Sequence, residues 1–186
     1  MHGLCNRALH CFLRLRLGEA GWNAVARQAG APAGGFEAFG QYDDALTARM
    51  LVAAGAHSGL DRETLLEDLG TWLVSDPCCE AIRRLLRFGG ADFAGFVFAL
   101  EDLPDRARLA VPDLVLPDLS VVPVEGGVRL VVGAGLDGFA AVVAGLVRAM
   151  ADDYGTLVVL TALPDAVELR LVEADFAEGR RFALAG

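Results

Sequence analysis

Lysine is missing from this sequence of 186 residues, and all sixteen basic side chains are arginine. Against them stand 25 acidic residues, which give a formal net charge of −9 at pH 7. A negative field repels the phosphate backbone of DNA and RNA. We therefore expect no nucleic-acid partner.

Long apolar runs are also absent, although 54% of the residues are hydrophobic. A bilayer span needs about 18 to 20 consecutive apolar residues. The longest run here, from Phe139 to Met150, is interrupted by Gly145 and Arg148. The first residues do not follow the charged-then-apolar layout of a signal peptide. We therefore expect no membrane span and a cytoplasmic protein.

Cysteine is scarce, and its spacing is not that of a metal site. The four cysteines are Cys5, Cys11, Cys78 and Cys79, and no histidine pair follows them at zinc-finger distance. In a reducing cytosol they are most simply buried thiols. Cys78 comes directly after Pro77, so it is the best candidate for a lowered thiol pKa.

The chain has only three histidines, and none follows His57. His10 shares a face with His2, Asn6 and Arg14 at four-residue spacing, which predicts the polar face of a first helix. We expect none of the three histidines to be clearly buried. A structural or solvated role is therefore favoured over a metal ligand.

Apolar spacing and helix-stop signals predict helices first and strands last. Helices are expected over about 2–17, 22–29, 43–57, 61–73, 77–88, 91–103 and 136–154, and strands over 119–124, 128–132, 157–160 and 167–172. Four prolines between 104 and 123 favour an extended connector. The fold class is α+β, with a helical N-terminal half followed by a small antiparallel sheet packed with a long helix. We expect one domain over 1–186, helical to about 103.

Catalytic motifs are scarce. There is no nucleophile elbow, P-loop or zinc-protease pair. Glu101, Asp102 and Asp105 could supply a general acid and base, but a solvated helix end is the commoner explanation. The segment 133–138, GAGLDG, resembles a dinucleotide loop only superficially, and a tight strand-to-helix turn is favoured. We expect no enzyme.

Several segments together resemble the H-NOX (haem nitric oxide/oxygen binding, HNOB) family over almost the entire chain. They are Met1-His2-Gly3 before an amphipathic helix, Asp61–Gly70, Asp92–Leu103, Leu116-Pro117-Asp118-Leu119, and Gly145-Leu146 through Tyr154-Gly155. The resemblance implies an H-NOX-like fold, bound haem and nitric oxide sensing by a stand-alone bacterial protein. It also implies a signalling partner, such as a histidine kinase or a diguanylate cyclase or phosphodiesterase.

Departures from the family fall at the positions that hold haem. The family's iron ligand is a histidine, and Pro104 takes its place in this chain. The family's Tyr-x-Ser-x-Arg motif, which binds the haem propionates, falls on Gly133, Gly135 and Asp137. An Asp opposes a propionate where an Arg would pair with it.

Three functions stay open at this point. The domain could bind haem through a non-standard axial ligand, with Cys78, Cys79 or His10 as candidates and Cys5 also near. It could instead be a haem-free regulator that binds an apolar ligand or a partner protein, or an enzyme of unrecognised type. By the resemblance, the residues expected to line the pocket are Cys5, Leu9, Leu73, Phe98, Pro117 and Val142.

Overall fold

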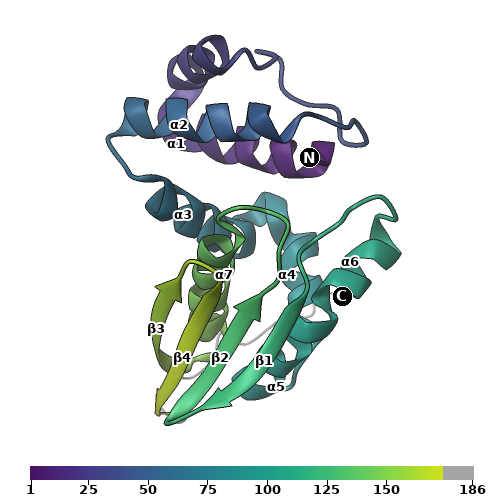
Figure 1. The fold of residues 1–186 in the computed structure, drawn as a ribbon, viewed down its shortest axis with the longest axis vertical. Helices are drawn as coiled ribbons and strands as arrows, with labels where there is room; N and C mark the ends of the chain where they lie inside the picture. The colour runs from purple at the N-terminus through teal and green to yellow at the C-terminus, as the bar shows by residue number, and fades with distance from the viewer. Residues whose placement is uncertain (174–186) are drawn as a thin grey trace. The chain divides into compact units, whose positions relative to one another are not determined.

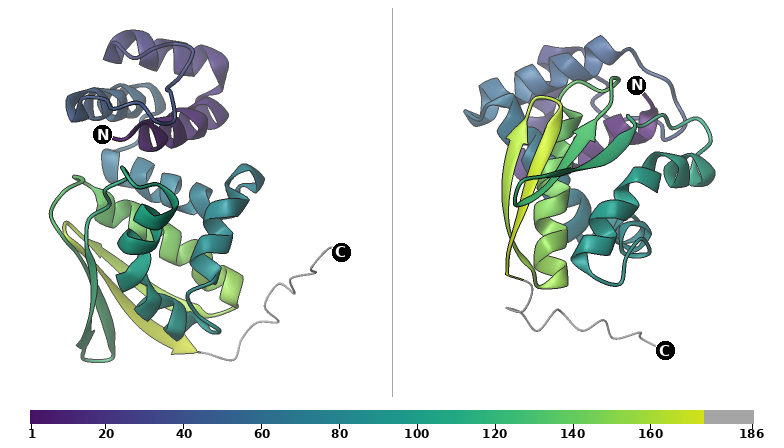
Figure 2. Two further views of the ribbon diagram at one scale, coloured as in Figure 1. Left: turned by 90° about the vertical axis from the view of Figure 1, so that its right-hand side faces the viewer. Right: turned by 60° about the horizontal axis from the view of Figure 1, so that its bottom comes forward.

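The computed structural model describes residues 1–173, and these form two compact units. The first unit comprises Met1–Leu65 and Asp113–Val115, and the second comprises Leu66–Pro112 and the residues from Leu116 on. Helices come first, and a small antiparallel sheet packed with one long helix comes last (Figures 1 and 2). The predicted α+β fold is confirmed. Within residues 1–173, no helix combines the length and apolarity that a membrane span requires.

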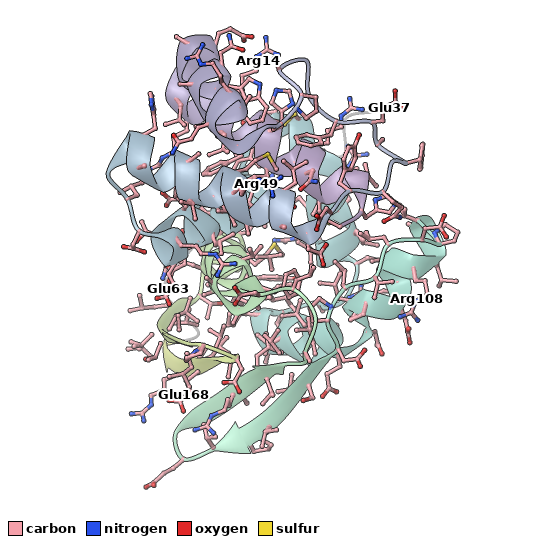
Figure 3. All side chains as sticks on the ribbon, turned by 45° about the horizontal axis from the view of Figure 1, so that its top comes forward. Arg14, Glu37, Arg49, Glu63, Arg108 and Glu168 are labelled. Carbon is pink, nitrogen blue, oxygen red and sulfur yellow. The ribbon has the colours of Figure 1, made fainter. Side chains whose placement is uncertain are left out.

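The first unit is built on two helices, α1 (Gly3–Ala29) and α2 (Asp44–Ser58). The two helices expected over 2–17 and 22–29 form one helix with a kink at Gly18, which has φ 71° and ψ 175°. Arg49 of α2, labelled in Figure 3, donates from Nε to the carbonyl oxygen of Ala29 over 2.9 Å. The two helices thus support each other at the end of α1.

The start of α1 is held against the segment that precedes α2. Gly3 donates its N–H to the carbonyl oxygen of Gly40 over 2.7 Å, and His2 forms an isolated β-bridge with Gln41. A Cβ atom on Gly3 would collide with the carbonyl oxygen of Glu37. The close approach of two backbones therefore explains why glycine occupies the third position.

The second unit contains most of a helix that begins in the first and then a run of short helices. Their bounds are α3 (Arg62–Ser75), η1 (Pro77–Cys79), α4 (Glu80–Arg87), α5 (Phe93–Ala99), η2 (Leu100–Asp102) and α6 (Leu103–Ala110). The extended connector predicted from residue 104 is wrong as far as Ala110. Pro104 lies in the first turn of α6, where a missing N–H costs the helix no hydrogen bond.

A four-stranded antiparallel sheet closes the second unit. The strands are β1 (Leu119–Val124), β2 (Gly127–Val132), β3 (Leu157–Leu163) and β4 (Ala166–Glu173), and their order is β1-β2-β4-β3. The long helix α7 (Phe139–Tyr154) connects β2 to β3 and lies against one face of the sheet (Figure 1). All four strands were predicted, with bounds that differ by at most three residues.

The core of the second unit lies between α7 and the sheet. Val147 and Met150 of α7 are buried with Leu130 of β2 and Val167 of β4. Complete burial of a side chain of this size contributes about 1.5–3 kcal/mol. The apolar residues Val167, Leu169 and Leu171 of β4 alternate with Glu168 and Arg170, and the first two are buried whereas Leu171 is 51% exposed.

Helices α3 and α7 cross at two glycines. A Cβ atom on Gly70 would collide with the carbonyl oxygen of Val142, and one on Gly145 would collide with that of Glu67. Beside this crossing, Thr71 Oγ1 donates to the carbonyl oxygen of Gly145 over 3.2 Å. The two backbones thus meet without side chains between them.

A buried carboxylate ties α4 to α7. Asp153 is 7% exposed, and its two carboxylate oxygens accept hydrogen bonds from Arg83. Arg87 donates to the carbonyl oxygen of Asp153 over 3.0 Å and lies 4.4 Å from the ring centroid of Tyr154. The sequence analysis missed this network, although Arg83 and Arg87 are spaced to share one helix face.

The glycine crossing leads to a stability prediction. We expect Gly145→Ala to lower the free energy of unfolding by about 1–3 kcal/mol, because overpacking outweighs the better helix propensity of alanine. Gly95→Ala is the control, since its added methyl meets the end of the Asp92 side chain at 3.2 Å and no backbone closer than 3.5 Å. Urea unfolding measures both variants. Equal free energies of unfolding for the two variants would contradict the inference that the contact between α3 and α7 leaves no room for a side chain at residue 145.

Candidate functional site

The position expected to hold the iron ligand is a proline at the start of α6. Pro104 is buried and offers no donor atom to a metal. The helix around it is fixed by Arg106, which donates to the carbonyl oxygens of Leu85 over 3.2 Å and of Ala99 over 2.7 Å. The α6 segment is therefore anchored to α4 and α5, but residue 104 has no ligand chemistry.

Of the three acidic residues considered for general acid–base chemistry, two make local structural contacts. Asp105 pairs with Arg108 over 2.7 Å at an exposed surface. Glu101 Oε1 accepts from the backbone N–H of Val121 over 2.7 Å. The solvated helix end favoured in the sequence fits these contacts.

The loop between β2 and α7 borders a cavity of about 250 Å³. Its lining comprises residues 132–140, Pro164 and Asp165. This volume is below the usual range of about 300–1,000 Å³ for ligand pockets. Asp137 and Asp165 both line the cavity, and no lining residue is basic. A lining of this charge is unfavourable for an anion such as a propionate.

The same loop is a tight turn from strand to helix, as favoured from the sequence. Gly135 has φ 149° and Gly138 has φ 80°, conformations that only glycine adopts readily. Phe139 donates its N–H to the carbonyl oxygen of Leu136 over 3.0 Å. Strands β2 and β3 are each antiparallel to β4, which lies between them, so β2 and β3 run parallel to each other. The expectation that no βαβ unit surrounds the loop is therefore wrong, because β2, α7 and β3 form a βαβ unit that β4 splits.

Pro117 lies beside this turn. A Cβ atom on Gly135 would lie 3.5 Å from Pro117 Cγ, and the backbone N–H of Gly133 donates to the carbonyl oxygen of Asp118 over 2.8 Å. The connector before β1 and the loop before α7 are therefore in contact. Pro117 is the one predicted pocket residue that the structure brings next to the expected propionate position.

The other pocket residues predicted in the second unit lie on three different helices. Leu73 of α3 and Val142 of α7 are half-buried, and Phe98 of α5 is 52% exposed. None of the three lines the cavity beside Gly133–Gly138. They therefore stay predictions.

Cys78 and Cys79 lie in η1, before α4. Their sulfur atoms are 3.7 Å apart, with Cys78 exposed and Cys79 buried. The Asp76 side chain accepts from the backbone N–H of Cys78 over 2.9 Å. A hydrogen bond to Asp76, burial and the neighbouring Cys79 thiol together raise the pKa of Cys78 to about 12.

The lowered pKa predicted for Cys78 is therefore wrong. Pro77 correctly marked a helix start, but Asp76 occupies its cap and holds the thiol proton. Iron is bound by the thiolate and not by the thiol. At neutral pH, Cys78 is protonated and is a poor axial ligand.

His10 of the first unit is enclosed by aromatic rings. Its imidazole centroid lies 4.3 Å from that of Trp22 and 6.5 Å from that of Phe36. A Cβ atom on Gly35 would lie 2.5 Å from the imidazole, so the ring is also covered by backbone. Burial, together with the positive charge of Arg14, lowers the pKa of His10. The neutral form binds metals, but here the ring is packed inside its own unit.

The expectation that none of the three histidines is clearly buried is wrong for His2 and His10 and holds for His57, and Asn6 beside them is buried as well. His2 is 6% exposed, Asn6 is 0% and His10 is 8%. Asn6 Oδ1 accepts from Thr47 Oγ1 over 2.7 Å, and His2 Nδ1 accepts from the backbone N–H of Leu4 over 3.2 Å. These partners lie close along α1 or come from α2. The four-residue spacing was correct, but it could not tell a solvated polar stripe from a buried one. Within residues 1–173 the buried Nδ2 of Asn6 has no hydrogen-bond partner.

The two remaining candidates of the first unit also lie on α1. Leu9 is 3% exposed, and Cys5 is half-buried. Burial raises the pKa of the Cys5 thiol. No group of three or more His, Cys, Asp or Glu side chains within residues 1–173 could hold a metal ion.

The environment of Cys78 leads to a chemical prediction. We expect Asp76→Asn to lower the pKa of Cys78, because the amide removes the negative charge and the carboxylate acceptor that favour the thiol. Since alkylation requires the thiolate, the Cys78 rate at pH 9 should rise at least about tenfold. Mass spectrometry after iodoacetamide treatment measures the rate, with exposed Cys11 as internal reference. An unchanged ratio of Cys78 to Cys11 labelling would show that Asp76 does not raise the pKa of Cys78.

Comparison with known proteins adds a family and a fold to this geometry. The sequence profile of the family described as HNOB, Haem-NO-binding, matches residues 2–162. No curated protein matches the chain. Solved H-NOX structures do match it at low sequence identity, and at that level the likeness shows the fold.

Three of these structures illustrate the likeness. A Cs H-NOX mutant with 4-cyano-L-phenylalanine at site 5 has TM-score 0.77 at 12% identity, covering 95% of this chain and 100% of its own. A mutant of T. Tengcongensis H-NOX gives the same four values. An oxygen-binding H-NOX domain related to soluble guanylate cyclases, in its oxygen complex, has TM-score 0.70 at 12% identity, covering 97% and 100%. The chain therefore has the H-NOX fold.

Proposed function

Because the chain belongs to the Haem-NO-binding family, we propose that it is a sensory domain that acts on a signalling partner and not an enzyme. The family match over residues 2–162 is the observation that carries this proposal. The fold and the family are those of gas-sensing haem domains in general. The partner we propose is a histidine kinase or a diguanylate cyclase or phosphodiesterase, in the cytoplasm.

The first candidate mechanism is a haem-based nitric oxide sensor with an unusual axial ligand. The family description supports haem and nitric oxide. Cys78, Cys79 and His10 are the axial-ligand candidates, and the raised pKa of Cys78 counts against that residue. Cys5, Leu9, Leu73, Phe98, Pro117 and Val142 would line the pocket.

The second candidate is a haem-free regulator that keeps the scaffold. Pro104 supplies no lone pair to iron, and Gly133 and Gly135 supply no hydroxyl to a propionate. Two carboxylates, Asp137 and Asp165, line the cavity, and none of its lining residues is basic. The residues at the ligand and propionate positions therefore do not fit haem. This chemistry supports the haem-free candidate over the first.

A hemin titration tests the choice. We expect the unaltered chain to show no saturable Soret band, because the residues at its donor positions have no ligand chemistry. Pro104→His should create a saturable band that shifts when the reduced protein meets nitric oxide. Pro104→Ala is the matched control, since it removes the proline without adding a ligand.

The first candidate gives the opposite pattern. The unaltered chain would then show a saturable band that shifts with nitric oxide. Cys79→Ser or His10→Gln would abolish that band, and Cys11→Ser would leave it unchanged. Circular dichroism on each variant separates loss of haem from loss of fold.

A further inference from the structure

The two edges of the sheet differ in how they are protected. Strand β1 forms one edge, and it carries two features that prevent pairing with another strand. Pro123 has no N–H to donate, and the N–H of Val121 is bound by Glu101 over 2.7 Å. Proline and occupied backbone donors on an edge strand block the addition of a further strand.

Strand β3 forms the other edge and has neither feature. Its sequence, LVVLTAL over Leu157–Leu163, contains no proline and no charged residue. Among residues 1–173 its one strand partner is β4, and their register is regular from Val158 to Leu163. Because N–H and C=O groups point alternately to the two sides of a strand, about half of those in β3 point away from β4.

The side chains of β3 are unusually apolar for an edge strand. Leu157 is 54% exposed and Val159 is 52% exposed. A long, uncharged, apolar edge is a template for pairing with another strand. The whole chain has a net charge of −9, so two copies repel each other over most of their surfaces. The side chains of β3 carry no charge and add nothing to this repulsion.

We propose that β3 pairs antiparallel with β3 of a second copy of this chain, joining the two four-stranded sheets into one. Two identical strands related by a two-fold axis must run antiparallel, and every strand pair in this sheet is antiparallel. In a two-fold contact each residue of one strand faces a residue of the same strand in the other copy, and only the residue at the axis faces itself. A strand without charges therefore suits a second copy better than a charged one would. The proposal is independent of haem and goes beyond the proposed function, to which it adds an interaction surface.

The outer face of β4 next to β3 is compatible with this contact. Glu168, labelled in Figure 3, is paired with Arg129 of β2 over 2.6 Å, so its charge is balanced within one copy. Thr161 lies directly opposite Glu168 on β3. Val159 and Thr161 are the exposed side chains of β3 nearest to this ion pair, and they would lie on the same face of the joined sheet. Valine and threonine are residues that favour cross-strand pairing.

The experiment measures the mass of the full chain in solution by sedimentation equilibrium over a range of concentrations. We expect a reversible dimer of the 19.6 kDa chain. Val159→Lys should weaken it at least about tenfold, because it places a positive charge on the same face of β3 in both copies and so brings like charges to the contact. Val122→Lys is the matched control: Val122 is 45% exposed on the same face of the sheet but on β1, and its variant should keep the dimer.

Two further measurements keep the result independent of folding. Circular dichroism should be the same for both lysine variants. Mixing equal amounts of the Val159→Lys and Val159→Glu variants should restore the dimer through opposite charges. Hydrogen exchange of β3 amides should slow as the concentration of the unaltered chain rises.

Other outcomes would overturn the proposal. A monomer at all concentrations up to about 100 μM would do so, since it places any self-pairing outside a useful affinity range. So would a dimer that Val122→Lys disrupts and Val159→Lys does not. A chain ending at Glu173 that dimerises while the full chain stays monomeric would assign the edge to residues 174–186 instead. Protection of β3 amides that is independent of concentration would likewise point to an occupant within the same chain.

Discussion

The second unit depends on the absence of side chains where α3 meets α7. A helix pair normally keeps its axes about 8–10 Å apart because side chains lie between the backbones. Gly70 and Gly145 remove those side chains at the crossing, and each glycine then faces a carbonyl oxygen of the other helix. The position of α7 follows from this contact, and α7 in turn covers the inner face of the sheet. The ion pair of Arg148 with Glu67, over 2.9 Å, fastens the same two helices at their exposed side.

This constraint explains where the chain agrees with its family and where it departs. The segments that carry the resemblance include Gly3, Gly70, Gly145 and Pro117, and each lies at a close approach of two chain segments. The departures at Pro104, Gly133, Gly135 and Asp137 change side-chain chemistry and leave the backbone path intact. A shared fold at 12% identity therefore shows the scaffold and does not by itself show which ligand the chain binds.

The sequence predicted those features that local chemistry decides. The cap at Asp43, the kink at Gly18 and the bounds of β1 all follow from residues close together in the chain. The helix α6 was missed because a proline was read as ending regular structure, whereas in the first turn it starts a helix.

The candidate site was less predictable because it depends on partners distant in sequence or on the direction of a single side chain. Asn6 is buried with its side-chain oxygen bound by Thr47, 41 residues later, while its Nδ2 has no hydrogen-bond partner within residues 1–173. Asp153 is tolerated in the interior because Arg83 lies opposite, 70 residues away. The pKa of Cys78 is set by Asp76, only two residues away, but the sequence does not reveal whether that carboxylate turns toward the thiol.

The edge strand β3 and the residues at the haem-ligand and propionate positions depend on different chemistry. Haem chemistry depends on particular side chains, so a few substitutions can remove it. Strand pairing depends on backbone N–H and C=O groups, which every residue except proline carries in full. Those groups stay available however the ligand positions change, provided that α7 continues to support the sheet. Pairing through the sheet edge therefore does not depend on which side chains occupy the positions of the haem ligand and the propionate motif.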